Sequence, residues 1–254
     1  MAVKQSSEIT IDLTRFRFLV IGPYGSGKSA FGATLPQPGL VFDFTNNGML
    51  YNKGDWDVAS HPLTPEGWME FEKEWRFYYD QIRSGKSKYK SVNFDDATGL
   101  DNLAMERALQ MDPKRNPAQG PLWNVHYQLV KNLVEGKYRQ LLSLPVNICV
   151  CCHTAITKDE DTGAVIDISP MLSGKLSTIL PGYFDEVYYA TVGTVDGNPA
   201  YRMQTVPVGL KQARSQISGV ARLLPNYVPN NFNEIYKIVT AALEKQKVAE
   251  GKAV

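Results

Sequence analysis

The segment Gly22–Ser29 constrains the fold of this chain more than any other stretch. It reads Gly-Pro-Tyr-Gly-Ser-Gly-Lys-Ser and matches the full pattern G-x-x-x-x-G-K-[ST]. The segment follows the β-rich run Phe16–Ile21, and a helix is predicted over Lys28–Leu35, ended by Pro36 and Pro38. The pattern alone is short enough to occur by chance. Here it stands between a strand and a helix, which is the context that a phosphate-binding loop requires.

The residue types of this loop suit the binding of a triphosphate. Backbone N–H groups can surround phosphate oxygens only where the chain curls tightly, and Gly25 and Gly27 permit that curl. Lys28 is expected to reach the β- and γ-phosphates, and the Ser29 hydroxyl is expected to coordinate Mg²⁺. The expected cofactors are therefore ATP and Mg²⁺. The residues expected to bind the nucleotide are Gly22, Pro23, Tyr24, Gly25, Ser26, Gly27, Lys28, Ser29 and Ala30.

A second acidic motif follows in the run Val92-Asn93-Phe94-Asp95. A carboxylate at the end of an apolar strand is typical of a Walker B motif, so Asp95 is expected to hold Mg²⁺ opposite Ser29. The neighbouring Asp96 has three possible roles: it could be the metal ligand instead, it could position a water molecule, or it could cap the next helix.

The spacing of the two motifs indicates the class of P-loop protein. About 60 residues separate Ser29 from Ser91, and they contain the strand candidate Leu40–Phe44. In nucleoside kinases the two motif strands are neighbours, whereas RecA and AAA proteins insert another strand between them. The intervening segment leaves room for such a strand, and the sequence has no recognisable Arg-rich lid of the kind that small-molecule kinases carry.

The order of elements predicts an α/β fold with a mainly parallel central sheet covered by helices on both faces. The aromatic stripe of the helix that starts at Thr64-Pro65 is expected to pack on this sheet. One domain is expected over residues 1–245, with a C-terminal β-hairpin extension and a flexible tail at 246–254. The remaining expected strands are Trp56–Ala59, Tyr89–Phe94, Val146–Cys152, a short edge strand at 165–168, and the hairpin strands Asp185–Val195 and Ala200–Val206. The remaining expected helices are Leu100–Met111, Leu122–Leu144 and Asn231–Lys245.

Composition excludes several classes of protein. Twenty-seven Lys and Arg balance 26 Asp and Glu, so a nucleic-acid partner would need locally concentrated positive charge. No apolar run is long enough for a membrane helix, and the start of the sequence lacks the apolar core of a signal peptide. Cys149, Cys151 and Cys152 lie too close together for disulfides and are expected in a buried strand of a reduced protein. The expected location is the cytoplasm, with no membrane partner.

Taken in order, these stretches resemble a RecA-like P-loop ATPase of the kind that many phages encode. That group of phage nucleotide-binding proteins includes short recombinase-core single-strand annealing proteins. The resemblance covers Phe16 to about Pro207, and only its first stretch is highly specific alone. The matching stretches are 22–35, 40–48, 91–100, Trp123, 147–156 and 168–189.

The resemblance implies roles for further residues. His153 ends the strand after Asp95, where RecA-like proteins place a polar residue that senses the γ-phosphate; it could equally be a structural histidine at a strand end. The segment Thr154–Ser173 stands in the place of a DNA-binding loop. Arg214, after the hairpin, is the candidate for a cation supplied to the nucleotide of a neighbouring copy, although a solvated charged face explains it as well.

One position departs from the family pattern. RecA-like enzymes carry a water-activating glutamate two residues after an aspartate on the strand that follows the P-loop helix, but here Asp43 is followed by Phe44 and Thr45. Threonine cannot act as that base. Asp43 or Asp96 are the candidates to replace it, and otherwise hydrolysis is slow.

Three functions follow as hypotheses. The first is a DNA-dependent ATPase that assembles as a ring or filament on single-stranded DNA in phage recombination, annealing or replication. The second is a nucleotide-gated assembly factor with little hydrolysis and no nucleic-acid partner. The third is a phosphotransferase for a small substrate.

Overall fold

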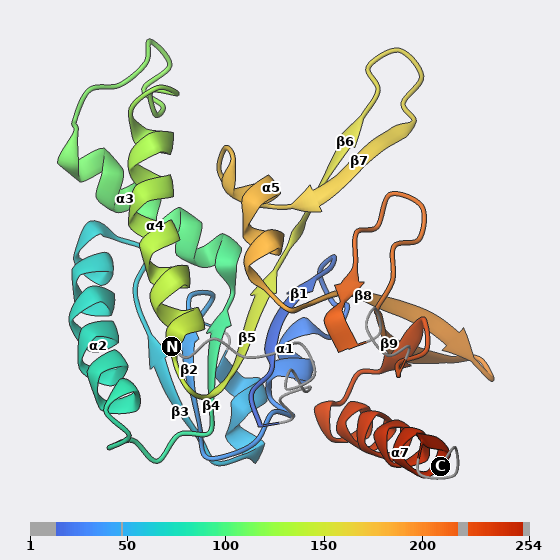
Figure 1. Ribbon diagram of the computed structural model, residues 1–254. Coiled ribbons are helices and arrows are strands. Elements are labelled where there is room, and N and C mark those ends of the chain that lie inside the picture. Colours follow the sequence, from blue (N-terminus) through green and yellow to red (C-terminus); the bar gives the residue numbers. More distant parts are fainter. Residues whose placement is uncertain (1–13, 47, 218–222, 251–254) are drawn as a thin grey trace.

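Strand β1 (Arg17–Ile21) lies inside a mixed sheet, which suits the continuous apolar run from Phe18 to Ile21. The computed structural model describes residues 14–46, 48–217 and 223–250, and in this part of the chain the sheet has nine strands (Figure 1). Their order is β11-β9-β8-β1-β5-β4-β2-β3, with β10 paired to β8. The strands from β3 to β8 in this order are parallel, and β9, β10 and β11 pair antiparallel. The central strands are β2 (Gly39–Asp43), β3 (Trp56–Ser60), β4 (Ser91–Asp95), β5 (Asn147–Cys152) and β8 (Glu186–Val195).

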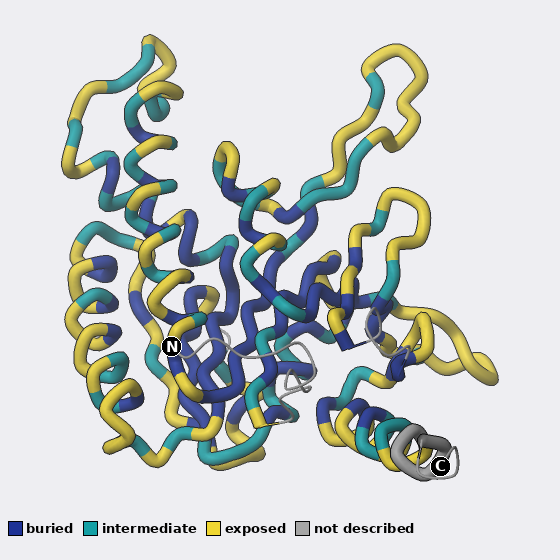
Figure 2. The backbone as a smooth tube through the Cα atoms, in the orientation of Figure 1, coloured by how far each residue is buried: buried dark blue, intermediate teal, exposed yellow. Residues whose placement is uncertain are grey.

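Alternation along β1 divides the core into two layers. Leu19 and Ile21 belong to the apolar cluster on one face of the sheet, and Phe18 and Val20 belong to the cluster on the other. Because both faces are covered, the strand is apolar at every position from Phe18 to Ile21. Figure 2 shows the resulting buried band through the middle of the molecule.

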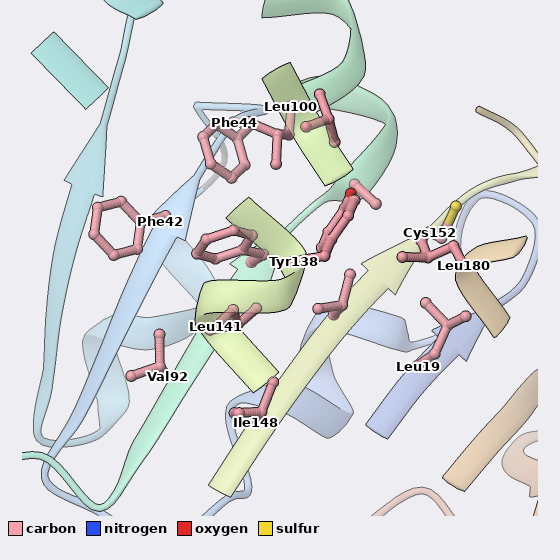
Figure 3. Packing of buried hydrophobic residues seen from close by; sticks show 14 of the residues in the cluster. Leu19, Phe42, Phe44, Val92, Leu100, Tyr138, Leu141, Ile148, Cys152 and Leu180 are labelled. Carbon is pink, nitrogen blue, oxygen red and sulfur yellow. The ribbon is translucent and has the colours of Figure 1, made fainter. Parts of the chain in front are cut away.

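Three helices cover one face: α2 (Pro65–Arg83), α3 (Ala97–Met111) and α4 (His126–Ser143). In α2 the predicted aromatic stripe is core, since Trp68, Phe71 and Trp75 are buried. Figure 3 shows Tyr138 and Leu141 of α4 above the sheet residues Phe42, Val92 and Ile148. The stripe therefore packs on protein, as predicted, and is not free to stack on bases.

The other face is covered by α1 (Lys28–Gly32) and α7 (Phe232–Glu250). Phe18 of the sheet meets Phe31 and Phe232 edge to face, at ring-centroid distances of 5.1 and 6.0 Å. Helix α7 continues past its predicted end at Lys245, and residues 251–254 of the predicted tail lie outside the described residues.

The inserted strand is not the predicted one. Strand β5 lies between β1, which leads into the phosphate-binding loop, and β4, which ends in Asp95. The strand Leu40–Phe44, which the spacing suggested for this place, is β2 and lies on the far side of β4. An inserted strand is present, as the spacing of the two motifs predicted, but it comes from later in the chain. All six residues of β5 are buried, which suits the centre of the sheet.

The segment after β5 forms a separate two-stranded hairpin, where the sequence predicted only an edge strand. Strand β6 (Thr154–Lys158) pairs antiparallel with β7 (Val165–Pro170), and the ribbon projects from the body of the molecule (Figure 1). A turn between the two strands joins them. Ile156 and Ile166 are exposed on the ribbon.

The predicted C-terminal hairpin joins the sheet itself. Strand β8 pairs in parallel with β1, and β9 (Asn198–Gln204) returns along β8, so the predicted hairpin extends the central sheet. Among the helices, α3 begins earlier than predicted and α4 begins later, at His126. The remaining elements are η2 (Gly48–Lys53), α5 (Leu176–Ile179), η3 (Leu180–Tyr183), β10 (Arg214–Ser215) and β11 (Tyr227–Pro229).

None of the helices in the described ranges has both the length and the apolar character needed to span a membrane. The three cysteines are unpaired and buried in β5, as predicted.

Candidate nucleotide-binding site

The loop between β1 and α1 has the curled backbone that its glycines predict. Gly25 and Gly27 have φ angles of +71° and +87°, which residues with a side chain rarely adopt. A Cβ atom on Gly27 would also come within 2.2 Å of Asn230 Nδ2. The loop borders a cavity of about 960 Å³. The cavity is lined by Tyr24, Gly25, Ser26, Gly27, Lys28, Ser29, Ala30, Thr45, Met49, Leu50, Asp95, Asp96, His153, Tyr201, Pro229, Asn230 and Asn231.

Most of the predicted loop residues therefore share one cavity. Gly22 and Pro23 do not line it, but their carbonyl oxygens accept hydrogen bonds from Lys28 Nζ at 3.0 and 2.9 Å. Lys28 Nζ also lies 3.1 Å from His153 Nδ1. Burial lowers the pKa of Lys28, and the nearby Asp95 and Asp96 oppose that shift. The ammonium is thus held by neutral acceptors that a polyphosphate can replace.

The predicted metal residues lie in contact. Ser29 Oγ donates to Asp95 Oδ1 at 3.0 Å, and Tyr51 donates its phenolic hydrogen to Asp95 Oδ2 at 2.9 Å. Burial raises the pKa of Asp95, and these two hydrogen bonds oppose the rise. Both oxygens of the carboxylate are therefore oriented before any ligand binds.

These groups fit a magnesium ion. Mg²⁺ prefers hard oxygen ligands and is usually held by one or two carboxylates together with water and substrate phosphates. Ser29 and Asp95 supply two such oxygens beside the phosphate-binding loop. Within the described ranges no cluster of three or more His, Cys, Asp or Glu side chains could hold a metal without further help. The two oxygens of Ser29 and Asp95 suit a cation whose remaining ligands come from water and from the phosphates of a nucleotide.

Asp96 has two roles in the structure. Its side chain caps α3 by accepting from the Gly99 N–H at 2.6 Å, which is the helix-capping role that the sequence left open. Its Oδ2 also lies 2.8 Å from His153 Nε2. Since the Lys28 ammonium can only donate, His153 Nδ1 accepts from it and Nε2 carries the proton that is donated to Asp96. The carboxylate thus fixes the histidine ring, with Nδ1 toward Lys28.

Tyr24 covers this histidine. The two rings are 3.9 Å apart between centroids with an interplanar angle of 32°, although 76% of Tyr24 is exposed. His153 is therefore enclosed by Tyr24, Lys28 and Asp96 at the edge of the cavity.

Asp43 does not line the cavity. It is buried at the end of β2, beside Asp95 in the register of the sheet, and its Oδ1 accepts from the backbone and the hydroxyl of Thr45, both at 2.9 Å. Thr45 itself lines the cavity. Of the two carboxylates considered as replacements for the missing glutamate, the structure brings only Asp96 to the cavity.

Arg214 is not part of this cavity either. It lies on β10 and donates through Nη2 to the backbone carbonyls of Phe184 and Pro181. Its role toward a neighbouring copy stays a prediction.

Sequence reasoning missed the residues that close the site from distant segments. Tyr51 belongs to η2, and Asn230 donates from Nδ2 to the Gly27 carbonyl at 3.0 Å. Asn231 accepts from the backbone N–H of Asn233 at 2.9 Å, at the start of α7. In the sequence, Asn231 was predicted only as the first residue of the last helix, and no pattern indicated a role for Asn230 or Tyr51.

Three comparisons with known proteins bear on this site. A family model described as AAA domain matches residues 14–217, which is most of the chain. A KaiC-like protein from the hyperthermophilic archaeon Pyrococcus horikoshii is a similar solved structure, with 12% identity, a TM-score of 0.42, and coverage of 79% of this chain and 81% of that one. The comparison with curated proteins found no match.

Proposed function

The chain belongs to this AAA domain family, and from that premise we propose that it is a Mg²⁺-dependent ATPase acting on single-stranded DNA in recombination, annealing or replication. Nucleotide binding is the part that the family and the P-loop geometry support together. The observation that carries the proposal is the contact between Ser29 and Asp95 beside the loop. A bound Mg²⁺ would neutralise charge on the phosphate oxygens.

In this proposal the chain's own residues prepare the phosphate for attack. The loop N–H groups and Lys28 bind the phosphate oxygens, so Lys28 leaves the Gly22 and Pro23 carbonyls and His153. His153 Nδ1 then accepts a hydrogen bond from a water molecule while Asp96 keeps the ring in place.

Hydrolysis then follows by proton transfer to this histidine. The water oxygen bonds to the γ-phosphorus, the bond from that phosphorus to the β–γ bridging oxygen breaks, and one water proton passes to Nδ1. The products are ADP and inorganic phosphate. The His153–Asp96 pair thus takes the role of the glutamate whose position is occupied by Thr45.

The DNA part of the proposal is supported by connectivity. The β6–β7 hairpin starts at Thr154, directly after His153. A movement of His153 in response to the γ-phosphate would therefore be passed directly to this exposed ribbon. Phosphate release measured with and without a single-stranded oligonucleotide tests this. Stimulation by the oligonucleotide is expected, and release that is independent of DNA would contradict the DNA part alone.

A second candidate is a nucleotide-gated assembly factor with little hydrolysis. The observation that favours it is Thr45 at the cavity, where a water-activating carboxylate is expected in an active enzyme. Tight ATP binding without measurable phosphate release, together with ATP-dependent self-association in sedimentation, would support this candidate over the first.

A further inference from the structure

A second, smaller hollow lies away from the nucleotide cavity, where the start of α4 meets the segment before α5. Its volume is about 320 Å³. Two aromatic rings and two lysines are among the side chains that form it. Its lining residues are Trp123, Asn124, Tyr127, Gln128, Lys131, Gly174 and Lys175.

The aromatic part is an exposed tryptophan beside a tyrosine. Trp123 is 67% exposed, whereas the other three tryptophans of the chain, Trp56, Trp68 and Trp75, are at most 9% exposed. The rings of Trp123 and Tyr127 are 4.6 Å apart between centroids, with an interplanar angle of 42°. Apolar surface in contact with water is unfavourable, and most of the Trp123 side chain is left in contact with water in the described structure. It offers a flat face to a planar ligand.

The lysines supply the charge that such a ligand would need. Lys175 is exposed, and Lys131 is partly exposed with its Nζ 3.8 Å from Glu135 Oε2. That distance is long for an ion pair, and Glu135 is bound more closely by Arg139 at 2.7 Å. Both ammonium groups therefore remain able to pair with a phosphate.

The hollow is built on fixed backbone. His126 is fully buried, accepts from the Leu122 N–H at 2.7 Å and lies 2.8 Å from the Asp112 carbonyl, so it ties together both ends of the loop that carries Trp123. On the other side, Asp101 of α3 accepts from the backbone and the hydroxyl of Ser173, two residues before Lys175. A ligand here would meet groups that are already positioned.

We infer that this hollow is a stacking site for single-stranded nucleic acid, with a base on Trp123 and the backbone phosphates at Lys131 and Lys175. Aromatic faces beside cations are the usual means of binding single strands without sequence preference. The inference rests on the proposed DNA function, and it places the main DNA contact in this hollow instead of on the β6–β7 hairpin. The tip of the β6–β7 hairpin carries Asp159, Glu160 and Asp161, which repel phosphates, whereas this hollow carries two cations.

Tryptophan fluorescence offers a direct experiment. Because Trp123 is the only exposed tryptophan, oligo(dT) that stacks on it should quench and shift the exposed component of the emission, and should protect it from acrylamide. Binding is then measured by fluorescence anisotropy of labelled oligo(dT) and oligo(U) with Mg-ATP present. Trp123→Ala should weaken binding about tenfold or more, and Lys175→Ala should lower the slope of log affinity against log salt by about one.

Matched controls separate this site from the rest of the protein. Phe77→Ala removes another exposed aromatic, from α2, and should bind like wild type. ATP binding by calorimetry and thermal melting should be unchanged in Trp123→Ala. Equal binding by wild type and Trp123→Ala would overturn the inference and leave the DNA function standing. If the wild type binds neither oligonucleotide at about 50 mM salt, both the inference and the DNA function fail, while nucleotide binding is unaffected.

Discussion

The hydroxyl of Ser29 donates a hydrogen bond to Asp95 Oδ1 at 3.0 Å, although 66 residues separate the two in the chain. The contact is made because the strands that lead to them, β1 and β4, lie on either side of β5 and end at the same edge of the sheet. Parallel strands place their carboxyl ends together, so the phosphate-binding loop and the acidic residue share one cavity.

Removal of the loop lysine should abolish tight ATP binding. Lys28→Ala deletes a buried cation. Its three present acceptors are uncharged, so a polyphosphate should displace them from the ammonium. A charged hydrogen bond contributes about 1.5–3 kcal/mol, so affinity should fall at least tenfold by calorimetry. The exposed Lys86→Ala is the matched control and should bind ATP normally. Normal binding by the Lys28 variant would show that the nucleotide site lies elsewhere.

Substitution of the acidic residue should act through magnesium. Asp95→Asn is expected to reduce Mg²⁺-dependent hydrolysis much more than binding of ATP in EDTA. Tyr51→Phe should have a smaller effect in the same direction, since it removes only the hydrogen bond that orients Oδ2. Loss of that hydrogen bond should weaken Mg²⁺ binding by about 1 kcal/mol, so Tyr51→Phe should need roughly fivefold more Mg²⁺ for the same rate. Titration of phosphate release against Mg²⁺ measures it, and an unchanged Mg²⁺ dependence in Asp95→Asn would refute the assignment.

Disruption of the His153–Asp96 pair should slow the chemical step. His153→Ala is expected to lower kcat about 10²-fold or more with little change in KM, because the ring acts on the attacking water in the proposed reaction. Asp96→Asn should lower kcat too, through the loss of ring orientation. The double variant should be little worse than His153→Ala alone. Additive losses would mean that the two side chains act independently, and the dyad assignment would be withdrawn.

The buried carboxyl of Asp101 predicts a pH dependence of stability. Burial raises its pKa from 3.8 to about 6, and its hydrogen bonds with Ser173 oppose that rise. A raised acid pKa means that the folded state binds more protons than the unfolded state between these values, so this group destabilises the fold as pH rises through that window. From pH 8 to pH 5 the wild type should gain roughly 1.4 kcal/mol relative to Asp101→Asn. Urea unfolding of both proteins across that range tests it, and parallel pH profiles would disprove it.

Local sequence patterns predicted much of the fold and of the site. The loop Gly22–Ser29 was recognisable because its residues are consecutive and their backbone conformations are local. Burial of the α2 stripe followed from helical spacing, and the predicted hairpin strands Asp185–Val195 and Ala200–Val206 correspond to β8 and β9. The pairing of Ser29 with Asp95 was also predictable, since both stand at strand ends of a parallel sheet.

The contacts that complete the site were not predictable from such patterns. Tyr51 reaches the Asp95 carboxylate, and Tyr201 and Asn230 line the cavity, only through the packing of elements that are far apart in the chain. The two helix starts that differed, in α3 and α4, depend on caps and turns: Asp96 begins α3 early, and the fixed loop around His126 delays α4.

The amino-acid sequence alone therefore determined the loop, the acidic strand end and the alternation of strands and helices, because each depends on neighbours in the chain. Only the tertiary structure decided that β5, and not β2, lies between the two motif strands, and that Asp96 holds His153 while Asp43 stays beneath Thr45. The physical reason is that β2 and β5 are both mainly apolar and are buried at every position. Either could occupy a central position by burial alone, and the choice depends on how all the strands and their covering helices pack together.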